Sequence, residues 1–342
     1  MWQGIIGHDD TVSYFRQVLM ARRLATTYLF VGTPGIGKRR FALELARSLL
    51  CTESYEFSLA PCGKCESCRL FAAGNHPDLE LVALPPDKST LPIELFIGDR
   101  EHRNQEGMCH NLAMKPFFGR RKVAIVDDAD HFGIASANCL LKTLEEPPPS
   151  ALLILIGTSP SRQLPTIRSR SQVVRFNPLP EEAVVDILLA TGAMTDRELA
   201  HRVASLSEGS VERATKLADS ALWEFRDQLY SALRAARPDA VRLTRSIQSF
   251  VDEAGKEPAT KRDRLRIVVG FAIEFYRARL RETPQGNNLS PAVHALDACL
   301  TTLEYIDRNA NVGLVLQHWC EQLSGKTTSE KTSIRPLALS TH

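Results

Sequence analysis

The stretch Tyr28-Leu-Phe-Val-Gly-Thr-Pro-Gly-Ile-Gly-Lys38 decides the fold, because it joins a short apolar run to a glycine-rich loop that ends in a lysine. An amphipathic helical pattern follows at 39–50. Between a strand and a helix, the N–H groups of such a loop cradle phosphates and its lysine reaches their outer oxygens. The predicted nucleotide-binding residues are Gly32, Thr33, Pro34, Gly35, Ile36, Gly37, Lys38 and Arg39.

The last of these residues departs from the usual pattern. Phosphate loops of this type continue with Ser or Thr, whose hydroxyl binds Mg²⁺, but Arg39 offers no hydroxyl. We therefore expect a loop that can bind ATP or ADP with Mg²⁺ but hydrolyses the nucleotide poorly. A glycine-rich turn that binds no ligand is the alternative.

The apolar run 122–126 ends in two carboxylates, Asp127 and Asp128. In phosphate-loop ATPases, carboxylates at the end of such a strand hold Mg²⁺ and align the attacking water, so both are predicted catalytic residues. Asp128 stands where such enzymes carry Glu. Its side chain is one methylene shorter, and the resulting misplacement of about 1.3 to 1.5 Å can cost roughly 100-fold in rate. An exposed acidic loop without a catalytic role is the alternative.

The rest of the chain separates into an α/β part and a helical part. A further buried strand is predicted at 152–156 after a helix at 135–146, and this alternation indicates a parallel sheet flanked by helices. From Pro180 onward the apolar residues recur at the helical period. The predicted domains are an α/β phosphate-loop domain at 1–177 with a cysteine insertion at about 51–68, a small helical domain at 178–220, an all-helical domain at 221–323 and a disordered tail at 324–342.

Four of the eight cysteines are closely spaced, at Cys51, Cys62, Cys65 and Cys68. Two C-x-x-C steps and a fourth thiolate suit tetrahedral Zn²⁺, so we predict a structural zinc site with these metal ligands. A redox-active pair and cysteines packed in a core are the alternatives. His76 lies nearby in the sequence but is expected to be a loop residue, because four thiolates already complete the coordination.

The composition indicates a globular protein that we expect to be cytoplasmic. Its 42 Lys and Arg residues nearly balance 40 Asp and Glu, and a net charge of +2 is far from the basic excess of a protein that grips DNA unaided. The sequence has no apolar run of membrane-spanning length and no signal-peptide pattern at its start. We therefore expect no membrane association, a reducing compartment, and DNA contacts that are local or shared.

Five motifs occur in the same order as in the bacterial clamp-loader subunits of the AAA+ superfamily and resemble theirs. They are 32–38, the cysteine insertion, 126–130, 137–147 and 164–171, and 306–316 resembles the last helices of the family's collar. The resemblance implies an AAA+ ATPase-fold domain, a helical lid and a collar through which subunits assemble. It also implies partners, namely a delta subunit, tau or gamma motor subunits, the β sliding clamp, and primer-template DNA contacted through the complex.

The resemblance assigns roles to single residues. Ser169-Arg170-Ser171 occupies the place of the family's Ser-Arg-Cys motif, whose arginine reaches the nucleotide of a neighbouring subunit. Arg170 is therefore the predicted catalytic finger acting in trans, and an ordinary surface arginine is the alternative. Thr158 falls at the family's sensor 1 position, which reads the γ-phosphate, and an ordinary strand-end hydroxyl is the alternative. The segment 5–8 resembles a short motif that packs near adenine, although a hydrophobic staple would look the same.

Three departures distinguish this chain from the family's ATP-hydrolysing motors. They are Arg39 after the loop, Asp128 in place of Glu, and Glu212 where motors carry the sensor 2 arginine. Arg213 is offset by about 100° around a helix and should point elsewhere. We therefore predict the stator subunit of a DNA polymerase III clamp loader, with little or no ATPase activity of its own. A tau/gamma-type motor and a free-standing DNA-binding AAA+ ATPase are the alternatives.

Overall fold

The computed structural model describes residues 2–235, 238–282, 290–308 and 310–325. The chain divides into two compact units, Met1–Ala218 (unit 1) and Asp219–His342 (unit 2). The predicted disordered tail lies outside the described residues from 326 onward.

Unit 1 is built on a parallel five-stranded sheet in the order β2-β3-β4-β1-β5. The strands are β1 Thr27–Val31, β2 Leu79–Val82, β3 Lys122–Val126, β4 Ala151–Gly157 and β5 Gln172–Arg175. The central strands β1 and β4 are buried along their whole length, which explains their continuous apolar sequence. The parallel sheet predicted from the sequence is confirmed, with β2 and β5 as additional strands at its two edges.

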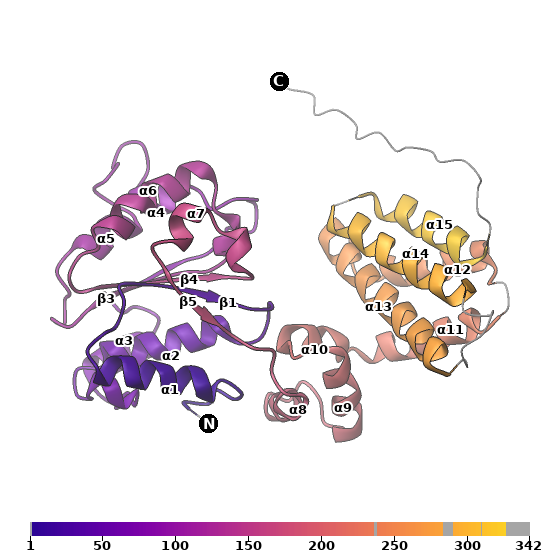
Figure 1. Cartoon of the computed structure of the whole chain (residues 1–342), viewed down its shortest axis with the longest axis horizontal. Helices are drawn as coiled ribbons and strands as arrows, with labels where there is room; N and C mark the ends of the chain where they lie inside the picture. The colour runs from indigo at the N-terminus through magenta and orange to yellow at the C-terminus, as the bar shows by residue number, and fades with distance from the viewer. Residues whose placement is uncertain (1, 236–237, 283–289, 309, 326–342) are drawn as a thin grey trace. The chain divides into compact units, whose positions relative to one another are not determined.

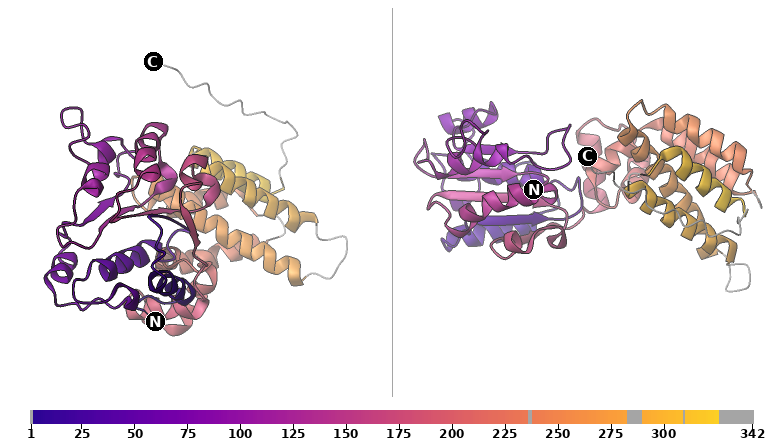
Figure 2. Two further views of the ribbon diagram at one scale, coloured as in Figure 1. Left: turned by 60° about the vertical axis from the view of Figure 1, so that its left-hand side comes forward. Right: turned by 90° about the horizontal axis from the view of Figure 1, so that it is seen from above.

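Helices cover both faces of this sheet (Figures 1 and 2). One layer contains α1 Asp9–Met20, α2 Lys38–Leu50 and α3 Glu66–Ala72, and the other contains α4 Glu94–Ile97, α5 Met108–Ala113, α6 Ile134–Glu145 and α7 Pro165–Arg168. Three short 3₁₀ turns lie in the connections, η1 Glu56–Ser58, η2 Ala129–His131 and η3 Pro160–Arg162. Each face of the sheet has its own hydrophobic core. Tyr28 and Phe30 belong to the core formed with α1 and α2, whereas Leu29 and Val31 belong to the core formed with α4, α5 and α6. Because successive side chains of a strand point to opposite faces, β1 contributes to both cores.

Three further helices of unit 1 follow the sheet in the described residues, α8 Glu181–Ala190, α9 Arg197–Leu206 and α10 Val211–Leu217. Asp196 caps α9 and Ser210 caps α10, each by accepting hydrogen bonds from backbone N–H groups of the first turn. The first residue of α10, Val211, donates its N–H to the carbonyl oxygen of Gly35 at 2.9 Å. This helical segment is therefore bonded directly to the glycine-rich loop.

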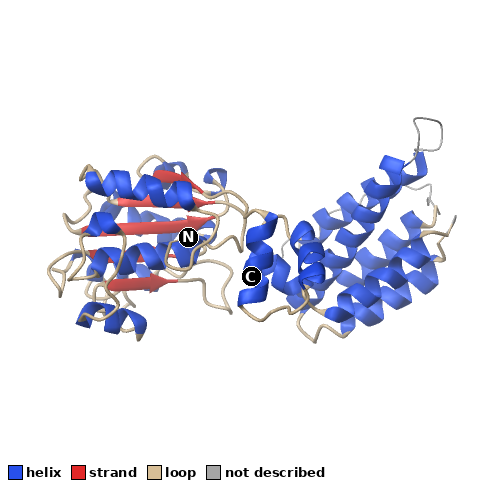
Figure 3. Ribbon diagram, turned by 90° about the horizontal axis from the view of Figure 1, so that it is seen from below, coloured by secondary structure: helices blue, strands red, loops and turns tan. Residues whose placement is uncertain are grey.

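Unit 2 consists of helices and loops wherever the structure describes it (Figure 3). The helices are α11 Ser220–Leu233, α12 Ala240–Asp252, α13 Pro258–Glu282, α14 Ser290–Asp307 and α15 Val312–Leu323. Capping side chains at Asp219, Asp239 and Asn311 fix where α11, α12 and α15 begin. Trp319 is fully buried, and its indole N–H donates to Cys299 Sγ at 3.4 Å. Each helix among the described residues falls short of the length or apolarity that a bilayer span requires.

Candidate functional site

A cavity of about 640 Å³ opens at the carboxyl ends of β1, β3 and β4, which are neighbours in the sheet. Open parallel sheets bind ligands at this edge, and the volume lies within the ~300–1,000 Å³ typical of ligand pockets. Its lining includes Pro34, Gly35, Ile36, Gly37, Lys38, Arg39, Asp127, Asp128, Thr158 and Glu212. The structure thus brings the predicted loop, carboxylates and sensor 1 residue together from separate parts of the sequence.

Lys38 is buried at the start of α2. Its Nζ donates hydrogen bonds to the carbonyl oxygens of Gly32 and Thr33, at 2.5 and 2.8 Å. These two predicted loop residues therefore act through their backbone and do not line the cavity. Burial lowers the pKa of the Lys38 ammonium, and the neighbouring carboxylates, of which Asp127 contributes most, oppose that shift.

Arg39 occupies the position where a hydroxyl would bind Mg²⁺, and its side chain pairs with Asp127. The distance from Arg39 Nε to Asp127 Oδ2 is 3.4 Å. The other oxygen, Asp127 Oδ1, accepts the backbone N–H of Asp128 at 3.1 Å. Burial, and next the Asp128 carboxylate, raise the pKa of Asp127, while the two cations Arg39 and Lys38 limit the rise. The strand-end carboxylate thus has a cationic partner within the same protein.

Asp130 is a member of the site that the sequence analysis did not single out. Its Oδ2 accepts hydrogen bonds from the N–H and the hydroxyl of Thr158, at 2.8 and 2.5 Å, and its Oδ1 accepts from Gln163 Nε2 at 2.7 Å. The carboxylate therefore fixes Thr158 at the end of β4. Its place at the end of the acidic run 126–130 was the available signal, but the run does not reveal which partner each carboxylate takes.

The helical segment places Glu212 against the loop. A Cβ built on Gly35 would lie 2.5 Å from Glu212 Cβ and 2.4 Å from Ser210 Oγ, and Gly35 has φ +76°. The close approach and the left-handed backbone both require glycine there. Arg213 lies outside the cavity lining and pairs with Glu208 at 2.9 Å, which agrees with its predicted offset.

The amino-terminal segment forms another wall of the cavity. Ile5, Ile6 and His8 line it, together with Leu179. His8 is buried, and its Nε2 lies 2.7 Å from the carbonyl oxygen of Ile36, so this nitrogen carries the proton that is donated. The hydrogen bond ties the amino-terminal segment to the glycine-rich loop.

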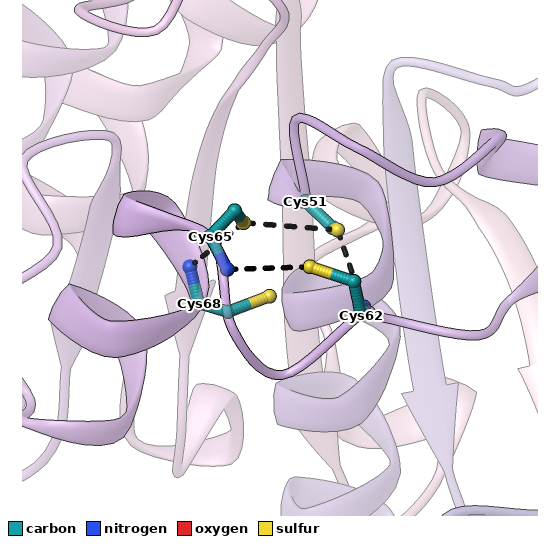
Figure 4. Close-up of side chains that lie close together, drawn as sticks. All are labelled: Cys51, Cys62, Cys65 and Cys68. Carbon is teal, nitrogen blue, oxygen red and sulfur yellow. Dashed lines mark hydrogen bonds between the residues drawn. The ribbon is translucent and has the colours of Figure 1, made fainter.

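The four predicted metal ligands converge away from this cavity. Figure 4 shows Cys51 at the end of α2, Cys62 in the following loop, and Cys65 and Cys68 around the start of α3. Their sulfurs all lie within 4.8 Å of one another, and those of Cys51 and Cys65 are 3.9 Å apart. Tetrahedral zinc with Zn–S bonds of about 2.3 Å places its sulfurs about 3.8 Å apart. The donor set and its spacing therefore fit zinc.

Backbone N–H groups favour the thiolate form of these cysteines. The amide of Cys62 points at Cys51 Sγ, that of Cys65 at Cys62 Sγ, and that of Cys68 at Cys65 Sγ, at 3.3 to 3.4 Å. Burial raises the pKa of Cys65, but hydrogen bonds from Thr52 and Cys68 outweigh burial and lower this pKa to about 6. The pKa of Cys51 is also lowered, whereas burial raises that of Cys68. None of the eight cysteines forms a disulfide. Zinc binds cysteines as thiolates, so its binding would release the remaining thiol protons.

His76 lies in the loop between α3 and β2, as expected, but its side chain is buried and anchors that loop. Its Nδ1 accepts the N–H of Asp78 at 3.0 Å, and its Nε2 lies 2.8 Å from Ser67 Oγ, which donates in turn to the carbonyl oxygen of Leu50. Both ring nitrogens are committed, so His76 is not a fifth metal ligand. Burial lowers its pKa, which keeps the ring neutral. The chain of bonds fastens α3 to the end of α2.

Arg170 lies on the surface beyond α7 and outside the cavity lining. Its guanidinium pairs with Glu145 at 2.8 Å, and the two side chains are 36% and 52% exposed. A further hydrogen bond to the carbonyl oxygen of Thr166, at 3.2 Å, holds the same group. The predicted finger therefore does not act on this chain's own cavity, and it is accessible from outside.

Comparison with known families now identifies the chain. A sequence model of the family described as "DNA polymerase III, delta subunit" matches residues 7–180, just over half of the 342 residues. The chain belongs to this family. The resemblance to bacterial clamp-loader subunits drawn from the motifs is thereby confirmed.

Individual relatives refine this assignment. DNA polymerase III subunit delta′ of Pseudomonas aeruginosa is 36% identical over 212 residues, which cover 61% of each protein. Subunit delta′ of Escherichia coli is 33% identical over 210 residues, 61% of this chain and 59% of that one. Subunit tau of Escherichia coli is 29% identical over 225 residues, 64% of this chain and 32% of that one. The matched part of the chain thus spans about three fifths of the length of these two delta′ relatives, and its sequence identity to them is higher than to tau.

Proposed function

We propose that the chain is the stator, or delta-prime, subunit of a DNA polymerase III clamp loader. In this proposal it assembles with a delta subunit and with tau or gamma motor subunits, and the complex places the β sliding clamp on primer-template DNA. Membership of the delta family and similarity to the delta′ relatives support the assignment. The net charge of +2 favours a grip on DNA that is shared among subunits.

The position of Arg170 is the observation that carries this function. It lies outside the chain's own cavity and on an accessible surface, as a finger directed at a neighbour's nucleotide must. A guanidinium beside the γ-phosphate stabilises the charge that develops there and accelerates hydrolysis by about 10³ to 10⁵. Leaving Glu145 costs little, since an exposed ion pair contributes only ~0.2–1 kcal/mol. Arg170 thus completes the site of an adjacent motor subunit.

The chain's own cavity is proposed to hold ATP or ADP without turning it over. The N–H groups at the start of α2 and the ammonium of Lys38 supply the phosphate contacts. The pairing of Arg39 with Asp127, the short side chain of Asp128 and the acidic Glu212 all disfavour hydrolysis. The ATPase activity of the isolated subunit is therefore weak or absent.

The remaining parts have structural roles in this proposal. Zn²⁺ bound by the four clustered cysteines stabilises the insertion at 51–68, and the ATPase-fold domain spans 1–177. Residues 178–220 act as the lid over the cavity. The helices of 221–323 form the collar through which the subunits assemble. We place the complex in the cytoplasm, where replication proteins of this family work.

A motor subunit of the tau type is the second candidate, favoured by the intact Lys38 and the similarity to tau. Two measurements on the purified chain separate it from the stator. Native mass spectrometry after mixing with the same organism's delta and tau or gamma subunits should show one copy in a heteromeric complex. The chain alone should show no ATP turnover above background, and turnover at the rate of the motor subunits would establish the motor instead.

A further inference from the structure

The nucleotide cavity does not fit the Mg²⁺ ion that phosphate loops ordinarily use. The ion is normally held between the hydroxyl after the loop lysine and the carboxylate at the end of the neighbouring strand. Here the hydroxyl is replaced by Arg39, and its guanidinium lies 3.4 Å from that carboxylate, Asp127. The arginine therefore lies where the ion would bind and partly offsets the negative charge that would attract it.

Several other oxygens near this position already accept hydrogen bonds. Asp127 Oδ1 accepts the N–H of Asp128, and both oxygens of Asp130 accept hydrogen bonds from Thr158 and Gln163. Mg²⁺ demands nearly octahedral oxygen coordination at about 2.0–2.1 Å and dehydrates reluctantly. It would have to displace Arg39 from Asp127. The cavity is therefore unsuited to Mg²⁺ in its charge as well as in its geometry.

We propose that the cavity binds a nucleoside polyphosphate without Mg²⁺, with Arg39 standing in the place of the ion between the phosphates and Asp127. This inference rests on the proposal that the cavity holds nucleotide at all. The arginine side chain is 58% exposed, so it can turn its fork toward a phosphate while staying near the carboxylate. Arg39 and Lys38 together supply two positive charges for the phosphates, beside the N–H groups of the loop. No metal-bound water is then aligned, which accounts for binding without hydrolysis.

Isothermal titration calorimetry of the full chain with ADP, in Mg²⁺ and in EDTA, tests the inference, with free Zn²⁺ buffered at the same level in both so that the cysteine cluster is unaffected. ADP should bind at least as tightly in EDTA as in Mg²⁺, because the ion competes with Arg39 and sequesters free nucleotide. Binding at least tenfold tighter in Mg²⁺ would overturn the inference. Absence of binding in both buffers would overturn the inference too. It would not bear on the trans role of Arg170, which is tested separately by the ATPase of the assembled complex.

Variants assign the effect to one side chain. Arg39→Ser restores the usual hydroxyl and should reverse the preference, so that ADP binds about tenfold tighter in Mg²⁺ than in EDTA. Arg39→Gln removes the charge without supplying that ligand and should weaken binding in EDTA by about tenfold or more. Arg23→Ser removes an exposed charge outside the cavity and should behave as the unchanged protein. The inference fails if both Arg39 variants keep the unchanged ratio, or if Arg23→Ser alters it.

Discussion

The four-cysteine cluster leads to a prediction about stability that depends on free zinc. A ligand that binds only the folded state adds RT ln(1 + [L]/Kd) to the free energy of unfolding, which is about 1.4 kcal/mol for each tenfold rise in ligand above Kd. The cysteines lie in unit 1, Met1–Ala218, and in a domain of that size about 1 kcal/mol shifts Tm by roughly 2–4 °C. Each tenfold rise in free Zn²⁺ should therefore raise the Tm of unit 1 by about 3–6 °C.

The assay is thermal unfolding in buffers that clamp free Zn²⁺ over several decades, with bound metal counted by elemental analysis. One zinc should bind per chain. Cys68→Ser removes one of the four ligands and should abolish the slope. Cys109→Ser changes a cysteine of the same unit that lies outside the cluster, and it should keep the slope. A wild-type Tm that does not change with free Zn²⁺, or a slope that survives in Cys68→Ser, would refute the zinc site.

Three smaller predictions follow from other contacts. Gly35→Ala should lower the free energy of unfolding, measured in urea, by clearly more than Gly74→Ala. The two glycines have nearly the same backbone angle, φ +76° and +74°, but only a Cβ at Gly35 meets neighbours within 4 Å. The Gly74 change, which reports the backbone strain alone, should cost about 1–2 kcal/mol. By NMR, His76 should titrate below its ordinary pKa of 6.5 and keep its proton on Nε2. Because a lowered folded-state pKa means that the unfolded chain binds the proton more readily, the contribution of His76 to stability should fall as the pH drops below 6.5. A pKa of 6.5 or above would contradict the buried network. Glu145→Gln should change the ATPase of an assembled complex by less than about fivefold, because an exposed pair contributes at most ~1 kcal/mol, and a loss as large as that of Arg170→Ala would show that Glu145 itself positions the finger.

Some of the fold could be predicted because buried strands have a recognisable apolar sequence. The strands β1, β3 and β4 lie in the middle of the sheet and carry continuous apolar runs, so they stood out. The edge strands β2 and β5 have four residues each, of which only one is buried, so they gave no such run. In unit 2, the helices α11, α12 and α15 begin at Asp or Asn caps, which sequence signals can indicate.

The site was predicted by residue type but not by contact. The sequence showed that Arg39 replaces a hydroxyl, yet its pairing with Asp127 depends on how two distant segments meet at the sheet edge. The same is true of Asp130, whose partner Thr158 follows a different strand. His76 shows the limit most clearly, because only tertiary packing turned a residue in a turn-like sequence into a buried anchor.

The most direct test of the stator account is the DNA- and clamp-stimulated ATPase of the loader reconstituted from the same organism's subunits, with Arg170→Ala in this chain. The matched control is Arg168→Ala, an exposed arginine two residues away. Assembly is verified by native mass spectrometry for each variant. The account predicts a fall of about 10³-fold or more at the dependent site for Arg170→Ala and an unchanged rate for Arg168→Ala. An unchanged rate in an intact Arg170→Ala complex would contradict the trans finger and with it the proposed role of this chain.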